Sequence, residues 1–185
     1  MSSVFIFPSG FPTSGLGELV SLDCPKGSLV LLEGPTGIGK TQFAKGFAAM
    51  LGIGETLTSP TFVTIQEYEG DRGALFHGDL DRFPSGPDPD FLEAFLSNRE
   101  NRWTLVEWGE RIGTSLWVLF PYVFRVCLSW EDGGGRKVEV TYLGGIGPRL
   151  QGETAFERLS GSLGTALKAF MDQTEKMGPG GVPGS

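Results

Sequence analysis

Apolar residues recur along the chain in two patterns, which predict alternating strands and helices. Continuous or alternating apolar runs predict strands, at residues 28–34, 61–68, 74–79, 102–107, 122–130 and 137–143. Apolar residues three and four positions apart predict helices, at residues 15–22, 40–51, 86–98 and about 153–172. The last two strands flank the turn "EDGGGR" and form a predicted β-hairpin. This order predicts an α/β fold, with a mainly parallel central sheet, flanking helices and antiparallel additions.

Length and composition predict one domain. The chain has 185 residues, of which 39% are hydrophobic, enough for one well-filled core and too few for two. We therefore predict a single domain over residues 1–177. Residues 178–185, "GPGGVPGS", lack the side chains to pack a core and are predicted to be disordered.

Charge and cysteine usage narrow the functional class. The formal charge is -7, and the 15 Lys and Arg residues form no run, which disfavours strong direct binding of nucleic acid. Cys24 and Cys127 form no disulfide framework or metal-ligand pattern, and we interpret both as buried apolar residues in a reducing compartment. The N-terminal segment lacks a basic region, and no apolar run is long enough to span a bilayer. These features predict a cytoplasmic protein that does not associate with a membrane.

The stretch "GPTGIGKT" matches the phosphate-loop pattern G-x-x-x-x-G-K-[ST], with an apolar strand before it and a helix after it. Glycines allow a tight turn, so that backbone N–H groups and the helix N-terminus converge on phosphates. The predicted nucleotide-binding residues of the loop are Gly34, Pro35, Thr36, Gly37, Ile38, Gly39, Lys40 and Thr41. We expect Lys40 to contact the β- and γ-phosphates and Thr41 to bind Mg²⁺ through its hydroxyl. A P-loop NTPase-like fold follows.

Two carboxylates stand where a phosphoryl-transfer site needs them. Asp79 closes "ALFHGD" and Glu107 closes "TLVE", so both are expected at the carboxyl edge of the sheet. Either one alone could be a solvated carboxylate at a strand end, but together they favour a catalytic site. His77, the only histidine, lies on an apolar strand and is interpreted as a hydrogen-bonded structural residue.

The segment "TSPTF" follows the phosphate loop at the distance where nucleotide switches place a γ-phosphate sensor. Ser59 and Thr61 are the candidate switch residues. An ordinary Ser-Pro turn is the alternative interpretation.

The order "GPTGIGKT", "SPTF", "HGDLDR", "VEWGE" closely resembles the TsaE family, from about Thr13 to residue 143. The resemblance implies a P-loop ATPase of tRNA threonylcarbamoyladenosine biosynthesis that uses ATP and Mg²⁺. It implies TsaB and TsaD as partners, with tRNA reached only through their complex.

The same resemblance implies roles for individual residues. Thr41 and Glu107 would bind Mg²⁺, Asp79 would act near the γ-phosphate or its attacking water, and Thr13 would lie near the adenosine. Trp108 would cover the nucleotide. The chain departs from the family at Asp81, where a tyrosine is usual, which puts an aromatic contact in doubt and leaves the chemistry intact.

Two other functions remain open. "DLDR" resembles the Asp-x-Asp of some P-loop small-molecule kinases, although no arginine-rich lid segment is visible. A regulatory GTPase would normally carry Asn-Lys-x-Asp, which is absent. No arginine finger can be assigned from the sequence: Arg82 and Arg136 are candidates, and a partner protein could supply one. We therefore expect the isolated chain to hydrolyse ATP slowly, and we expect that chain to be monomeric.

Overall fold

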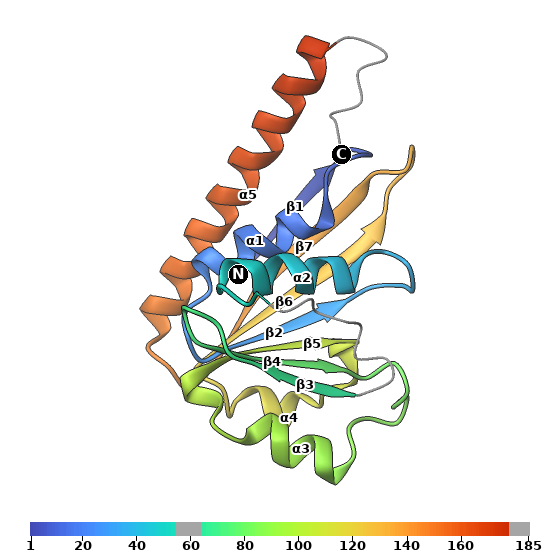
Figure 1. Ribbon diagram of the computed structural model, residues 1–185. Coiled ribbons are helices and arrows are strands. Elements are labelled where there is room, and N and C mark those ends of the chain that lie inside the picture. The colour runs from blue at the N-terminus through green and yellow to red at the C-terminus, as the bar shows by residue number, and fades with distance from the viewer. Residues whose placement is uncertain (55–63, 178–185) are drawn as a thin grey trace.

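The computed structural model describes residues 1–54 and 64–177. Within these residues one sheet has the strand order β1-β7-β6-β2-β5-β4-β3 (Figure 1). The strands are β1 (Ser2–Phe7), β2 (Ser28–Glu33), β3 (Ile65–Tyr68), β4 (Ala74–Asp79), β5 (Arg102–Glu107), β6 (Tyr122–Trp130) and β7 (Arg136–Gly144). The helices are α1 (Thr13–Asp23), α2 (Lys40–Met50), α3 (Pro89–Leu96), α4 (Thr114–Trp117) and α5 (Arg149–Met177), with 3₁₀ turns η1 (Arg99–Asn101) and η2 (Gly109–Arg111).

The sheet has a parallel half and an antiparallel half. Strand β2 pairs in parallel with β5 and β6, and β4 pairs in parallel with β5. Strand β7 pairs antiparallel with both β1 and β6, and β3 adds an antiparallel strand to β4 at the other edge. The predicted α/β class, the mainly parallel centre and the hairpin of β6 and β7 are therefore confirmed.

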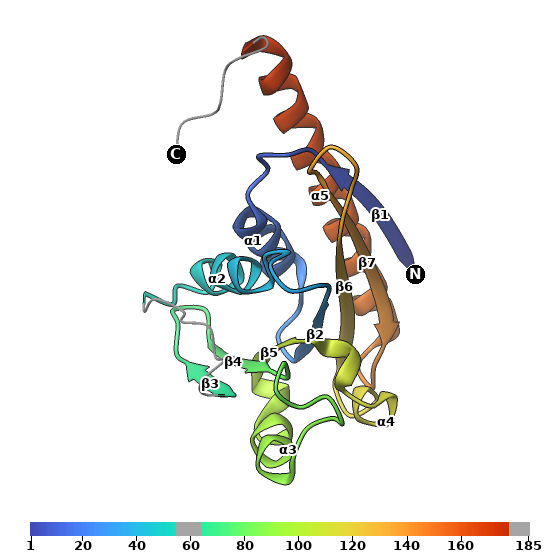
Figure 2. The same cartoon turned by 90° about the vertical axis from the view of Figure 1, so that its right-hand side faces the viewer.

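Helices cover both faces of the central strands, which explains why β2 reads as an unbroken apolar run. Helices α1, α2 and α5 lie on one face, and α3 and α4 lie on the other (Figures 1 and 2). Along β2, Val30 and Leu32 point into the core beneath α1 and α2, whereas Leu29 and Leu31 point into the core that includes Phe91. The carboxyl end of β2 is thereby fixed from both sides.

Several elements differ from the predictions. Strand β1 and helix α4 were not predicted: β1 is a short edge strand that depends on pairing with β7, and α4 is a single turn. Helix α5 runs over Arg149–Met177, longer than the predicted 153–172, because polar turns extend both ends of its apolar stripe. Of the predicted strand 61–68, residues 61–63 lie outside the described part, and Ile65–Tyr68 form β3.

Both cysteines are free, and only one is buried. Cys24 lies in the core, but Cys127 is half-buried on β6, where it pairs with Glu139 of β7. The prediction that both are buried is therefore wrong for Cys127. The apolar sequence around it reflects the alternate residues of β6, which point into the core under α5.

Candidate functional site

The phosphate-loop motif forms the connection between β2 and α2. Gly34, Gly37 and Gly39 have φ angles of 138°, 81° and 110°, in the region that favours glycine. A Cβ atom at Gly34 would also collide with the Leu128 carbonyl oxygen of β6. The loop therefore requires glycine for its conformation and for its close approach to the sheet.

Lys40 is folded back into this loop. Its Nζ donates to the carbonyl oxygens of Gly34 at 2.7 Å and Pro35 at 3.1 Å, and only 6% of the residue is exposed. Burial lowers the pKa of Lys40 below its ordinary value, against an opposing effect of the nearby carboxylates, with Glu107 first among them. The ammonium group is thus held at the loop mouth, among carbonyl oxygens and acidic side chains.

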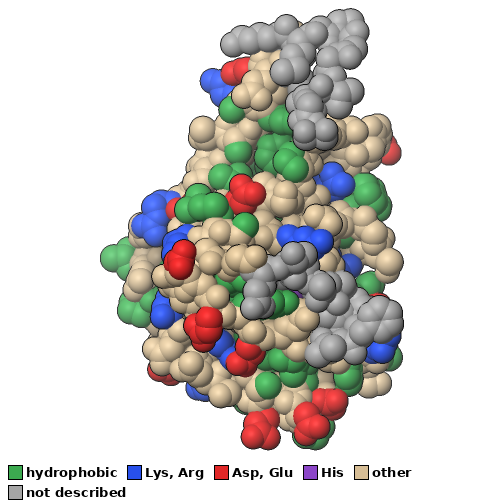
Figure 3. Space-filling model, in the orientation of Figure 1, with side chains coloured by type: hydrophobic (Ala, Val, Ile, Leu, Met, Phe, Trp, Pro, Cys, Tyr) green, Lys and Arg blue, Asp and Glu red, His purple; other side chains and the backbone are tan. Residues whose placement is uncertain are grey.

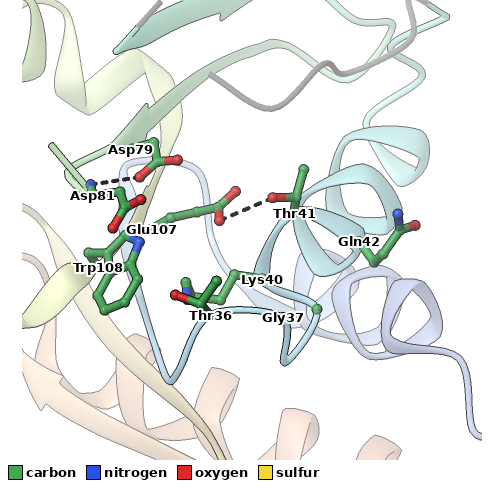
Figure 4. Close-up of a pocket in the computed structure, with 10 residues that line it drawn as sticks. Thr36, Gly37, Lys40, Thr41, Gln42, Asp79, Asp81, Glu107 and Trp108 are labelled. Carbon is green, nitrogen blue, oxygen red and sulfur yellow. Dashed lines mark hydrogen bonds between the residues drawn. The ribbon is translucent and has the colours of Figure 1, made fainter. Parts of the chain in front are cut away.

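Asp79 and Glu107 close the neighbouring strands β4 and β5 at the same level of the sheet. Glu107 accepts a hydrogen bond from the Thr41 hydroxyl at 3.2 Å, as Figure 4 shows. Its other oxygen lies 3.1 Å from Nε2 of His77, which is fully buried. His77 is therefore the hydrogen-bonded residue that was predicted, and its partner is the carboxylate expected to hold the metal.

A cavity of about 200 Å³ opens between the loop and the strand ends. Its lining residues are Thr36, Gly37, Gly39, Lys40, Thr41, Gln42, Asp79, Asp81, Glu107 and Trp108 (Figure 4). The hydroxyl, the carboxylates and the ammonium group come from α2, β4 and β5, which are distant in sequence. The fold thus brings the separate motifs to one place.

Trp108 stands over the loop and approaches Lys40. Its backbone is left-handed, with φ 60°, and the Lys40 Nζ lies 4.0 Å from the centre of its ring. The guanidinium carbon of Arg111 lies 4.6 Å from the same ring. Both cations lie within reach of a favourable interaction with the indole.

The remaining predicted residues fall into three groups. Gly34 and Pro35 take part through their carbonyl groups, and the Ile38 side chain is buried in the core. Thr13 does not line the cavity and lies buried at the start of α1, against Gly39. Ser59 and Thr61 lie outside the described residues.

Three residues near the site were not predicted to belong to it: Gln42, Asp81 and Arg111. For Asp81, the sequence indicates a departure from the family and the second carboxylate of the kinase-like "DLDR". Gln42 directly follows "GPTGIGKT", and Arg111 directly follows "VEWGE". Their closeness to these motifs is the one feature of the sequence that could have indicated them.

Arg136, a candidate arginine finger, supports the loop from behind. Its Nε donates to the Ile38 carbonyl at 3.1 Å and an Nη atom donates to the Phe11 carbonyl at 3.4 Å. The hairpin of β6 and β7 thereby reaches the loop from the antiparallel half of the sheet.

The donor set suits Mg²⁺ bound with a nucleotide. Thr41 and Glu107 offer one hydroxyl and one carboxylate, and Mg²⁺ in such sites completes its octahedron with phosphate and water oxygens. Among the residues that the structure describes, no cluster of three or more His, Cys, Asp or Glu side chains could form an all-protein cage. Fold and site together define a protein of the P-loop NTPase-like type.

The model of the family described as "Threonylcarbamoyl adenosine biosynthesis protein TsaE" matches residues 9–137. The chain therefore belongs to the TsaE family. It is 34% identical to the tRNA threonylcarbamoyladenosine biosynthesis protein TsaE of Nostoc sp., over 70% of this chain and 79% of that protein. It is 38% identical to the protein of the same name from Treponema pallidum, over 69% and 92% of the two chains.

A solved structure has the same fold. The crystal structure of Bacillus subtilis YdiB superimposes with a TM-score of 0.59 and 25% identity, covering 86% of this chain and 96% of that one. No helix in the described part of the chain has an apolar stretch long enough to cross a membrane.

Proposed function

We propose that this protein is a cytoplasmic, Mg²⁺-dependent ATPase that hydrolyses ATP slowly to ADP and phosphate in tRNA threonylcarbamoyladenosine biosynthesis. It would act as an accessory subunit of a TsaB–TsaD complex. The observation that carries the proposal is the convergence of Lys40 and Thr41 of the phosphate loop with Asp79 and Glu107 of neighbouring strands. The names of the relatives supply the pathway.

Each side chain has a definite task in this proposal. The loop N–H groups and Lys40 bind the phosphates, and Thr41 with Glu107 hold Mg²⁺, which supplies positive charge against the developing negative charge. His77 orients Glu107 through their hydrogen bond. Asp79 orients the attacking water and accepts its proton.

Slow hydrolysis by the isolated chain is expected from the lining of the cavity. No arginine is found among its lining residues within the described chain, and Arg136 is engaged with the carbonyl groups of Ile38 and Phe11. An arginine finger typically adds 10³–10⁵ in rate. A partner protein that supplied one would both accelerate hydrolysis and couple it to the complex.

The surface agrees with indirect contact to tRNA. Lys and Arg side chains are scattered over the face in Figure 3 and do not gather into a single patch, and the net charge is -7. A protein that binds RNA on its own usually presents a basic face.

The decisive experiment measures phosphate release from ATP by the protein alone and with TsaB, TsaD and tRNA. Low activity that rises with the partners supports the proposal. Activity that ignores the partners and rises with a small-molecule acceptor would instead favour a kinase, for which the presence of Asp81 in the cavity is the one structural argument.

Two variants test the assigned roles. Asp79→Asn should lower kcat about 10²- to 10⁴-fold with ATP binding retained, as expected for loss of a general base. The matched control is Asp90→Asn, on the exposed first turn of α3, which should keep the activity of the natural protein. Thr41→Ala should remove the Mg²⁺ dependence of ATP binding, and an unchanged dependence would contradict its role as a ligand.

A further inference from the structure

Arg111 connects two parts of the site that the sequence motifs treat as separate. One of its Nη atoms donates to the carbonyl oxygens of Leu80 and Asp81, in the turn that follows β4. Its guanidinium carbon lies 4.6 Å from the Trp108 ring centre. A guanidinium can donate in its plane and stack with its face at the same time, which an ammonium group cannot do.

The turn that Arg111 holds is the one that orients Asp79. The Asp81 N–H donates to Oδ1 of Asp79 at 2.8 Å, which fixes that carboxylate relative to the turn (Figure 4). The Leu80 N–H donates to the Glu107 carbonyl at 3.2 Å, so the turn is also tied to the end of β5. A displacement of the turn would therefore move the Asp79 side chain.

Arg111 is also connected to the phosphate loop, through Trp108. The Arg111 N–H donates to the Trp108 carbonyl at 3.0 Å, which closes η2 and places the two side chains next to each other. Trp108 in turn contacts Lys40, whose Nζ lies 4.0 Å from the centre of its ring. A continuous chain of contacts thus runs from Asp79 through Arg111 and Trp108 to Lys40.

We infer that Arg111 is a positioning residue, which holds the turn after Asp79 against Trp108 and so sets where the Asp79 carboxylate points. This inference rests on the proposed function. Arg111 does not line the cavity, so it acts through Asp79 and Trp108 and is not itself a catalytic residue.

The test compares Arg111→Met and Arg111→Lys with the unaltered protein. Arg111→Met should lower kcat about 10²-fold, the effect of displacing a reacting group by about 1 Å, while the ATP dissociation constant changes less than about threefold. Arg111→Lys keeps the charge and should not restore kcat, because it cannot donate and stack together. Added guanidinium ion at millimolar concentration should restore part of the activity of Arg111→Met.

The matched control is Arg99→Met. Arg99 also donates to two carbonyl oxygens, those of Leu96 and Leu119, but it lies away from the cavity. Loss of a structural arginine should lower the melting temperature and leave kcat unchanged. Equal losses of kcat in both variants would overturn the positioning role.

A second measurement does not depend on activity. The chain has 4 tryptophans, so labelling with 5-fluorotryptophan gives a fluorine spectrum in which Trp108→Phe identifies the Trp108 resonance. Arg111→Met should shift that resonance and leave those of the other tryptophans in place. An unmoved Trp108 resonance, or a kcat within about twofold of the original, would overturn the inference.

The two proposals can fail separately. If the unaltered protein released no phosphate, alone or with its partners, the proposed ATPase function would be refuted. The fluorine spectrum would still decide whether Arg111 holds Trp108 in place.

Discussion

The two halves of the sheet differ in what their strand ends do. In the parallel half, β2 ends in the phosphate loop, β4 ends at Asp79 and β5 ends at Glu107. The cavity lies across these three strand ends. In the antiparallel half, β1, β6 and β7 contribute no residue to the cavity lining. That half reaches the site only from behind, through Leu128 beside Gly34 and Arg136 beneath Ile38.

The difference shows how one half of a sheet can carry the candidate site while the other half stabilises the fold. Parallel strands bring their carboxyl ends to a common edge, where side chains from distant segments can meet. Antiparallel strands turn back from that edge and bury apolar area under α5 instead. Changes in the antiparallel half should therefore affect stability first, and changes in the parallel half should affect ligand binding first.

The largest expected effect is on stability, from Phe124→Ala in β6. Phe124 is fully buried, and its ring centre lies 5.2 Å from that of Tyr142. Removing such a ring costs about 3–5 kcal/mol of unfolding free energy, which corresponds to a melting temperature lower by roughly 10 °C. Thermal unfolding monitored by circular dichroism measures the shift, and ATP affinity measured well below the transition should be retained.

The next effect is on binding, from Lys40→Ala in the parallel half. Loss of a charge-assisted contact to phosphate costs about 1.5–3 kcal/mol, which weakens ATP binding about 10- to 150-fold. Lys45→Ala, on the same helix and outside the cavity lining, is the matched control and should bind ATP normally. Titration calorimetry distinguishes the two, and equal affinities would contradict the assigned role of Lys40.

Arg136→Met tests the contact between the two halves. The variant removes the hydrogen bonds to the carbonyls of Ile38 and Phe11 and leaves every cavity-lining residue in place. Loss of about 1 kcal/mol of support for the loop should weaken ATP binding about fivefold. An unchanged ATP dissociation constant would show that the antiparallel half does not support the loop.

The smallest expected effect comes from Glu33→Gln, at the end of β2. Burial raises the pKa of Glu33, Arg125 opposes this rise, and the charges of Glu110 and Glu139 add to it. The charged carboxylate therefore costs stability above its folded-state pKa, and this cost disappears below its unfolded value of about 4.3. The variant should melt about 1 °C higher at pH 8 and equal the natural protein near pH 3.

The sequence predicted the parallel half better than the antiparallel half, for a physical reason. The strand ending at Glu33 and the loop after it carry their structural requirements locally, in an apolar run and in glycines that must adopt positive φ angles. Strand β1 has no such local requirement, because its conformation depends on pairing with β7. Single-turn α4 likewise leaves too few residues for a periodic pattern.

Within the site, residue types were easier to predict than contacts. Lys40, Thr41, Asp79 and Glu107 stand at positions where the chemistry restricts the choice of side chain, and the structure brings all four together. The role of Arg111 depends on its hydrogen bonds to two carbonyl oxygens of another segment. The sequence does not reveal such contacts, because it shows only that an arginine stands three positions after Trp108.

The pairing of β1 with β7 has a consequence for synthesis on the ribosome. Ser2 contacts Thr141 across 139 positions of sequence, so β1 remains without its partner until β7 has been synthesised. Strand β2 is likewise flanked by β5 and β6, both made much later. Such long-range pairing makes folding slow and late. The nascent chain therefore cannot bind nucleotide until most of the protein has left the exit tunnel.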